Sequence, residues 1–146
     1  MRNFENKEKI VQVSGGLKVI SFLIMLLLGY AIIAAPLLLL VKPTANTREL
    51  VANIIPSIME FMVWWNFWDF FGRLKAGHLF DALTVKRLMN AGRWKIATWF
   101  CVLILLEVEN KFAVHPDGFF VGAGIIFTAW LLREGQTLEE EQKLTV

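Results

Sequence analysis

The sequence predicts an all-α polytopic membrane protein with four transmembrane helices, and three observations lead to this fold class. Hydrophobic residues make up 56% of the 146 residues and charged residues only 19%, whereas a soluble domain carries about 25% charged residues. The apolar residues gather in four stretches, each suited to a helix that crosses the hydrocarbon core. The basic residues between these stretches fall almost entirely on one side. The stretches and their short connections use nearly all of the chain, which predicts a single domain over residues 1–146.

The four expected spans have recognisable signals at their ends. They cover residues 17–41, 49–71, 94–108 and 116–132. Thr47 precedes the acidic first turn of the second span, and acidic residues favour the start of a helix. Pro56 lies inside that span and is expected to kink it, whereas Pro116 suits the first turn of the fourth span. For the first span, a signal anchor or a cleaved signal is the lesser alternative.

The distribution of Lys and Arg predicts the orientation of the spans. Twelve of the 15 basic residues flank the N-terminal side of the first span, lie between the second and third spans or at the start of the third, or follow the fourth. Only Lys42, Arg48 and Lys111 lie in the two opposite loops. Because cytoplasmic loops gather basic residues, both termini and the central loop are expected in the cytoplasm.

Gly118 and Gly122 form a small-xxx-small pair in the fourth span. Such a pair lets another helix approach closely. The alternative is that glycine is simply common in membrane helices, and the sequence leaves both interpretations open.

The central loop carries its own helical pattern. Asp81 is expected to cap a short amphipathic cytoplasmic helix, and Gly92 is expected to end it. Its apolar stripe consists of Ala82, Val85, Leu88 and Met89. Such a helix either lies on an anionic membrane surface as a lipid or docking element or merely leads into the third span; the second interpretation is favoured.

Residues 133–146 form a short acidic cytoplasmic tail. Gly135 suits a helix stop, and Thr137 with Glu140 three residues later matches a capping box. The tail acids are expected to pair with the basic central loop because both lie on the cytoplasmic side. The candidate cytoplasmic interaction surface consists of Lys86, Arg87, Arg93, Glu139, Glu140 and Glu141.

Polar residues inside the second span form the candidate intramembrane site. Asn53, Ser57 and Glu60 share one helix face by their spacing. Three interpretations stay open for Glu60: a protonated carboxyl group hydrogen-bonded within the bundle, a group that lines an ion or proton path, and part of a polar ligand site with Asn53. An ionisable residue at this depth is a functional candidate by default. Asp69 is expected to pair with Arg73 one turn later.

No catalytic, cofactor or metal site is predicted. The single cysteine, Cys101, lies in an apolar run and excludes an internal disulfide. His78 and His115 are expected on opposite sides of the bilayer, so they cannot share a metal. The sequence lacks the serine-elbow, zinc-protease and phosphate-loop motifs, and the net charge of +2 gives no reason to expect direct nucleic-acid binding.

The central segment and the tail resemble a bacterial family of small four-span membrane proteins known only as a domain of unknown function. The central likeness lies in the segment from Lys75 to Asp81, followed by Val85, Arg87, Leu88 and Gly92; the tail likeness lies in Gly135, Leu138, Glu141, Leu144, Thr145 and Val146. The family usually has Thr or Ser near Asp81, a mild departure because all three residue types cap helices. The resemblance implies a bacterial inner-membrane protein and a functional link to a small helix-turn-helix regulator. It implies no activity, substrate or cofactor.

Two functions are therefore expected, in order. The first is a non-enzymatic regulatory or scaffolding component that contacts the lipid bilayer and acts through a protein partner or a homo-oligomer at its cytoplasmic surface. The second is a small oligomeric channel or transporter that uses the intramembrane carboxylate of Glu60.

Overall fold

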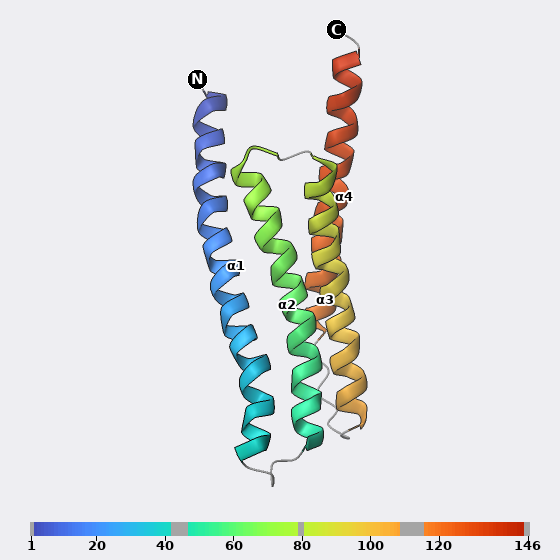
Figure 1. The fold of residues 1–146 in the computed structure, drawn as a ribbon. Coiled ribbons are helices and arrows are strands. Elements are labelled where there is room, and N and C mark those ends of the chain that lie inside the picture. The colour runs from blue at the N-terminus through green and yellow to red at the C-terminus, as the bar shows by residue number, and fades with distance from the viewer. Residues whose placement is uncertain (1, 42–46, 79–80, 109–115, 145–146) are drawn as a thin grey trace.

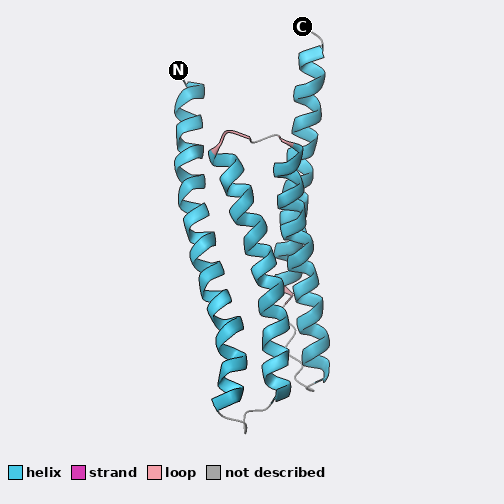
Figure 2. Ribbon diagram, viewed as in Figure 1, coloured by secondary structure: helices cyan, strands magenta, loops and turns pink. Residues whose placement is uncertain are grey.

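The protein consists of four long helices, as the sequence predicts. The computed structural model describes residues 2–41, 47–78, 81–108 and 116–144, and over these residues it contains no strand (Figures 1 and 2). The helices are α1 (Arg2–Val41), α2 (Thr47–Lys75), α3 (Ala82–Val108) and α4 (Asp117–Leu144). The all-α fold class is thus confirmed. The two connections expected to face outward are residues 42–48 and 109–115. Thr47 and Arg48 belong to α2, and residues 42–46 and 109–115 lie outside the described residues.

Each helix packs against its neighbour in the chain. Within the described residues, the helix pairs in contact are α1 with α2, α2 with α3, and α3 with α4. Successive helices run in opposite directions, so both chain termini and the α2–α3 connection lie at the same end of the molecule (Figure 1). We call this end the terminal end.

Two elements expected as separate short helices are instead continuous with longer ones. The central amphipathic helix is the first part of α3, which continues through Gly92 to Val108. The expected acidic tail helix is the last part of α4, which continues through Gly135 to Leu144. Thr137 donates to the carbonyl of Arg133 at 3.2 Å, so it bonds back into the helix and does not cap a new one. Both glycines were expected to end helices, and that expectation is wrong because the backbone ladder continues through them.

Gly92 and Gly122 let α3 and α4 come close together. A Cβ atom on Gly122 would lie 2.6 Å from Ile96 Cγ1 and 3.1 Å from the carbonyl oxygen of Gly92. A Cβ atom on Gly92 would lie 2.9 Å from the carbonyl oxygen of Gly122. Real Cβ atoms essentially never come within 3.0 Å of another atom, so a side chain at Gly92 or at Gly122 would force α3 and α4 to shift. Of the two interpretations left open for the Gly118–Gly122 pair, the structure thus supports a close approach at Gly122, and the Trp99 side chain fills the space over Gly118.

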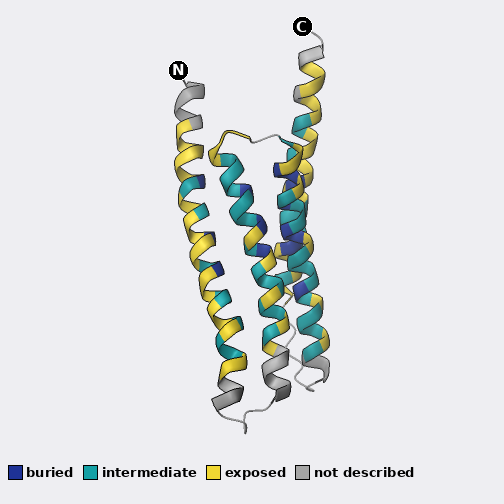
Figure 3. Ribbon diagram, in the orientation of Figure 1, coloured by how far each residue is buried: buried dark blue, intermediate teal, exposed yellow. Residues whose placement is uncertain are grey.

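Much of the surface of α1 and α4 is exposed, and few residues in the described part of the chain are buried (Figure 3). The small core cluster consists of Phe70, Leu88 and Ala129. The buried polar side chains are Ser14, Ser21, Asn66, Thr84 and Thr98. In contrast, α1 and α4 carry long rows of exposed Leu, Ile, Val, Phe and Trp, with Leu27 70% exposed and Phe120 66% exposed. Contiguous exposed apolar surface of this kind marks an interaction with lipid or with another protein.

Two segments are long and apolar enough to cross a bilayer on their own. They are Glu8–Leu37 in α1 and Asp117–Gln142 in α4. Over their described residues α2 and α3 do not meet the same criterion. Charged residues and tryptophans interrupt their apolar runs, and these polar groups form the candidate site.

Candidate functional site

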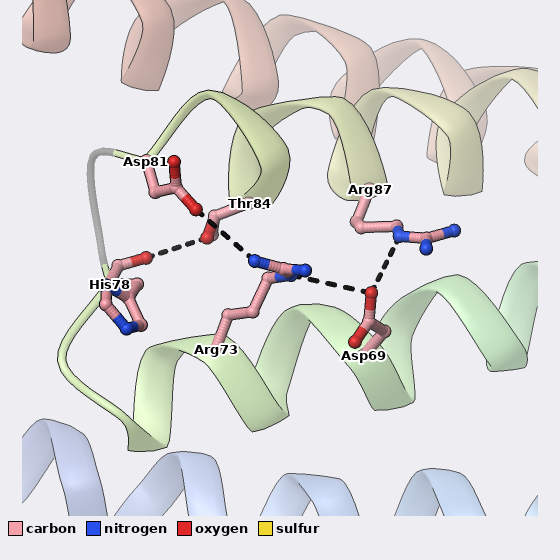
Figure 4. A network of polar contacts seen from close by, with 6 residues as sticks. All are labelled: Asp69, Arg73, His78, Asp81, Thr84 and Arg87. Atoms are coloured by element: carbon pink, nitrogen blue, oxygen red, sulfur yellow. Dashed lines mark hydrogen bonds and ion pairs between the residues drawn. The ribbon is translucent and has the colours of Figure 1, made fainter.

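The facing sides of α2 and α3 carry a network of four charged residues near the terminal end (Figure 4). Asp69 lies between two guanidinium groups: its Oδ2 is 2.7 Å from Arg87 Nε and 3.5 Å from Arg73 Nε. Arg73 Nη1 donates to Asp81 Oδ2 at 3.3 Å. The predicted Asp69–Arg73 pair is thus confirmed, and it belongs to a network that ties the two helices together.

The same region holds the connection between the two helices in place. α2 ends in a Schellman motif, in which His78 N donates to the carbonyl of Arg73 and Gly77 N donates to the carbonyl of Leu74, both at 3.0 Å. Gly77 has a φ of +86°, which glycine adopts without strain. The buried Thr84 hydroxyl donates to the carbonyl of His78 at 2.8 Å. The end of α2 and the start of α3 are therefore cross-linked by hydrogen bonds.

Asp81 occupies the position at which the sequence predicts a helix cap. α3 begins at Ala82, and Val85 N donates to the carbonyl of Asp81 at 3.1 Å. The only partner described for its carboxylate is Arg73. Asp81 therefore stands at the helix start, while its charge serves the network between the helices.

A second ionic contact lies deeper in the molecule. Lys95 Nζ of α3 donates to Glu60 Oε1 of α2, and the two side chains are 27% and 23% exposed. Glu60 precedes Asp69 by nine residues and Lys95 follows Arg87 by eight, so at 1.5 Å per residue this pair lies about 12–14 Å further from the terminal end. Lys95 was expected at the edge of the third span, and for that reason no partner was predicted for it. The signal was present: a helix that continues from Ala82 brings Lys95 level with Glu60.

The structure does not assemble Asn53, Ser57 and Glu60 into a common site. The Ser57 hydroxyl donates to the carbonyl of Asn53 at 2.7 Å, so it is used within its own helix. The Asn53 side chain is exposed. Glu60 is held by Lys95 from the neighbouring helix. The three residues share the predicted helix face, but only Glu60 contacts another element through a described polar bond.

Asn66 is a polar residue of α2 whose burial the sequence analysis did not predict. It is 4% exposed and lies between the Asp69 network and the Glu60–Lys95 pair. Its Nδ2 donates to the carbonyl of Met62 at 2.7 Å, and its Oδ1 has no hydrogen-bond partner within the described residues. Asn66 and Asp69 are three residues apart and share one side of α2, whereas Glu60 lies on a different side and still reaches Lys95 of α3.

The residues of the expected cytoplasmic surface have different environments. Arg87 pairs with Asp69, whereas Lys86 and Arg93 are exposed and line a pocket together with Arg133 of α4. Glu140 accepts a hydrogen bond from Gln136 at 3.4 Å, and Glu141 is exposed. The side chain of Glu139 lies outside the described residues. The expected pairing of Arg87 with the acidic tail is therefore replaced by its pairing with α2.

The charged side chains of α2 and α3 described above form ion pairs and hydrogen bonds between the two helices. The part of the chain that the structure describes holds no group of three or more His, Cys, Asp or Glu residues that could bind a metal ion. Cys101 is a free, half-buried thiol. Asp69, Arg73, Asp81 and Arg87 form one ionic network between α2 and α3, and Glu60 pairs with Lys95, an arrangement that can hold the two helices in register. Comparison of the chain with protein-family models, curated proteins and solved structures gives no match to any of them.

Proposed function

We propose that this chain is an integral membrane protein whose four helices all cross the bilayer. The observation that carries the proposal is the exposed apolar surface: α1 and α4 expose rows of large apolar side chains, from Ile10 to Leu37 and from Phe119 to Leu138. In water such a surface would be unfavourable by about 25 cal/mol per Å² of exposed apolar area, but in lipid it is solvated. α2 and α3 carry charges, yet Glu60 and Lys95 are paired, which lowers the cost of placing them in lipid.

The proposed orientation places the terminal end in the cytoplasm. The two chain termini and the α2–α3 connection meet at this end (Figure 1), and the regions of the sequence that lead to it contain 12 of the 15 basic residues. The positive-inside rule then favours a cytoplasmic terminal end. A bacterial inner membrane, and a link to a helix-turn-helix regulator, are supported only by the sequence resemblance.

The biochemical role that fits this arrangement is a non-enzymatic regulatory or scaffolding component. The α2–α3 ionic contacts are directed inward and hold the helices, whereas the last turns of α4 project beyond the start of α3 with Glu140 and Glu141 exposed (Figure 1). This acidic extension offers a surface to a basic partner in the cytoplasm. Electrostatic complementarity of this kind governs association rate and specificity more than raw affinity.

Two measurements test the proposal. Reporters fused after Val146 and within residues 42–46 should lie on opposite sides of the membrane, and a reporter after Val146 found outside the cell would overturn the orientation. The native complex isolated in mild detergent should lose its partner in the Glu140→Lys, Glu141→Lys variant. Glu8→Lys is the matched control because Glu8 is an exposed acid at the same end, on α1. Equal partner recovery from all three proteins would rule out the acidic extension as the binding surface.

An oligomeric channel or transporter is the second candidate. One observation in favour of it is that the Glu60–Lys95 pair is partly exposed. The other is that, among the described helices, α1 contacts only α2, so the rest of the α1 surface can pack against a second copy of the chain. Ion flux through liposomes that contain the parent protein and the Glu60→Gln variant tests this role. Absence of flux in the parent protein would eliminate it.

A further inference from the structure

A basic pocket of about 390 Å³ lies between α3 and α4. Its cationic residues are Lys86 and Arg93 of α3 and Arg133 of α4, all of them exposed. Its remaining lining includes the buried Val85 and the half-buried Met89. The pocket therefore combines a positive rim with an apolar floor.

The helix directions explain why the three cationic side chains converge. In a helix the Cα–Cβ bonds tilt toward the N-terminus. Arg93 of α3 therefore leans toward Lys86 and the terminal end, whereas Arg133 of the antiparallel α4 leans away from that end, toward Arg93. Lys86 also lies in the first turns of α3, where the helix dipole adds positive potential.

These three cations differ from Arg73, Arg87 and Lys95 of α2 and α3. Arg73, Arg87 and Lys95 each form an ion pair with a carboxylate. Lys86, Arg93 and Arg133 make no ion pair with an acidic residue among those the structure describes. Glu140 of α4 accepts a hydrogen bond from Gln136, another residue of the pocket lining.

We infer that this basic pocket binds the phosphate headgroup of an anionic phospholipid from the cytoplasmic leaflet. Guanidinium groups bind phosphate oxygens bidentately, and basic pockets between helices on the cytoplasmic side suit anionic headgroups. The apolar floor suits the glycerol backbone and the first methylene groups. Trp130, half-exposed and one turn from Arg133 on α4, is a residue type that favours this depth of a membrane. The inference rests on the proposed membrane insertion and orientation.

Lipid titration followed by native mass spectrometry of the detergent-solubilised full chain tests the inference. Phosphatidylglycerol should bind more tightly than phosphatidylcholine. Lys86→Gln should weaken the binding of phosphatidylglycerol about five-fold and the Arg93→Gln, Arg133→Gln variant about 30-fold, as expected for the loss of one and two charges near an anionic headgroup. Lys75→Gln is the matched control, since Lys75 is an exposed lysine at the same end and outside the pocket; its affinity should stay that of the parent protein.

Three results would overturn the inference. One is equal affinity for the two lipids, another is an equal loss in the Lys75→Gln and Lys86→Gln variants, and the third is full displacement of the lipid by millimolar inorganic phosphate, which would identify a site for a soluble anion. Circular dichroism of each variant shows that a lost affinity does not come from unfolding. Alkaline extraction of membranes separates the two proposals: a chain released by it refutes insertion, whereas a chain that stays in the membrane but binds both lipids equally refutes only the lipid site.

Discussion

Lys95 of α3 pairs with Glu60 of α2 across 35 positions of sequence. The two side chains are only 27% and 23% exposed, so each charge depends on the other for compensation. This contact is the clearest case in the molecule of a polar group whose role is set by a distant residue.

Removal of one partner of this pair should destabilise the fold strongly. Glu60→Gln or Lys95→Gln leaves a poorly solvated charge, which should lower the free energy of unfolding by about 3 kcal/mol. The double variant should lose less than either single variant, and the exchanged pair Glu60→Lys, Lys95→Glu should recover most of the stability. Unfolding by dodecyl sulfate in mild detergent, followed by tryptophan fluorescence, measures these values. Single variants as stable as the parent protein would show that the pair contributes nothing.

The α3–α4 crossing should tolerate no side chain at Gly122. A methyl group there meets Ile96 and the backbone of Gly92, so Gly122→Ala should cost about 1–3 kcal/mol. Gly124→Ala is the control in the same helix, because nothing lies within 4 Å of its Cβ position; it should be neutral or stabilise by up to about 1 kcal/mol. The same unfolding assay measures the stability of both variants. Equal effects of Gly122→Ala and Gly124→Ala would argue against the close approach of α3 and α4.

Gly77 should be required for its backbone conformation alone. Its φ of +86° disfavours residues that carry a Cβ atom, while the space around it is open. Gly77→Ala should therefore lower stability by about 1 kcal/mol. Gly16→Ala, in a helix interior with equally open surroundings, should instead be neutral or stabilising. A Gly77→Ala variant that matches Gly16→Ala would contradict the Schellman ending of α2.

The two aspartates of the α2–α3 network should contribute unequally. Asp69 contacts Arg73 and Arg87 and is 28% exposed, whereas Asp81 contacts only Arg73 at 3.3 Å and is 38% exposed. Asp69→Asn should therefore cost about 1–3 kcal/mol. Asp81→Asn should cost less than about 1 kcal/mol, because exposed ion pairs are weak and asparagine also caps helices. The reverse order of stabilities would place the centre of the network at Asp81.

Hydrophobic patterning was sufficient to predict the four helices, because apolar runs of this length have few alternatives to a helix. Short-range spacing likewise predicted the Asp69–Arg73 pair, and it offered the close approach at Gly122 as one of two interpretations. These features depend on residues within one or two turns of each other, or on the size of a single side chain.

The wrong and missed predictions all depend on the neighbouring helix. Gly92 resembles a helix stop in sequence, but α4 packs against it and the backbone continues as a helix. From the sequence, Lys95 was expected to flank a span, but in the structure it pairs with Glu60 of α2. Arg87, a residue of the basic central loop, was expected to pair with the acidic tail, but the register of α2 against α3 places it beside Asp69. Such partners are fixed by helix register, which the pattern of one segment does not contain.

Because each helix contacts the one made just before it, no step of assembly has to wait for a remote part of the chain. Once α2 has emerged from the ribosome it can pair with α1, and α3 and α4 can join in turn as they are synthesised. Mean sequence separation between contacting residues governs how fast chains fold, and here the separation is never more than one hairpin. A ribosome-bound chain that stops after α3 should therefore already hold its first three helices in their final arrangement.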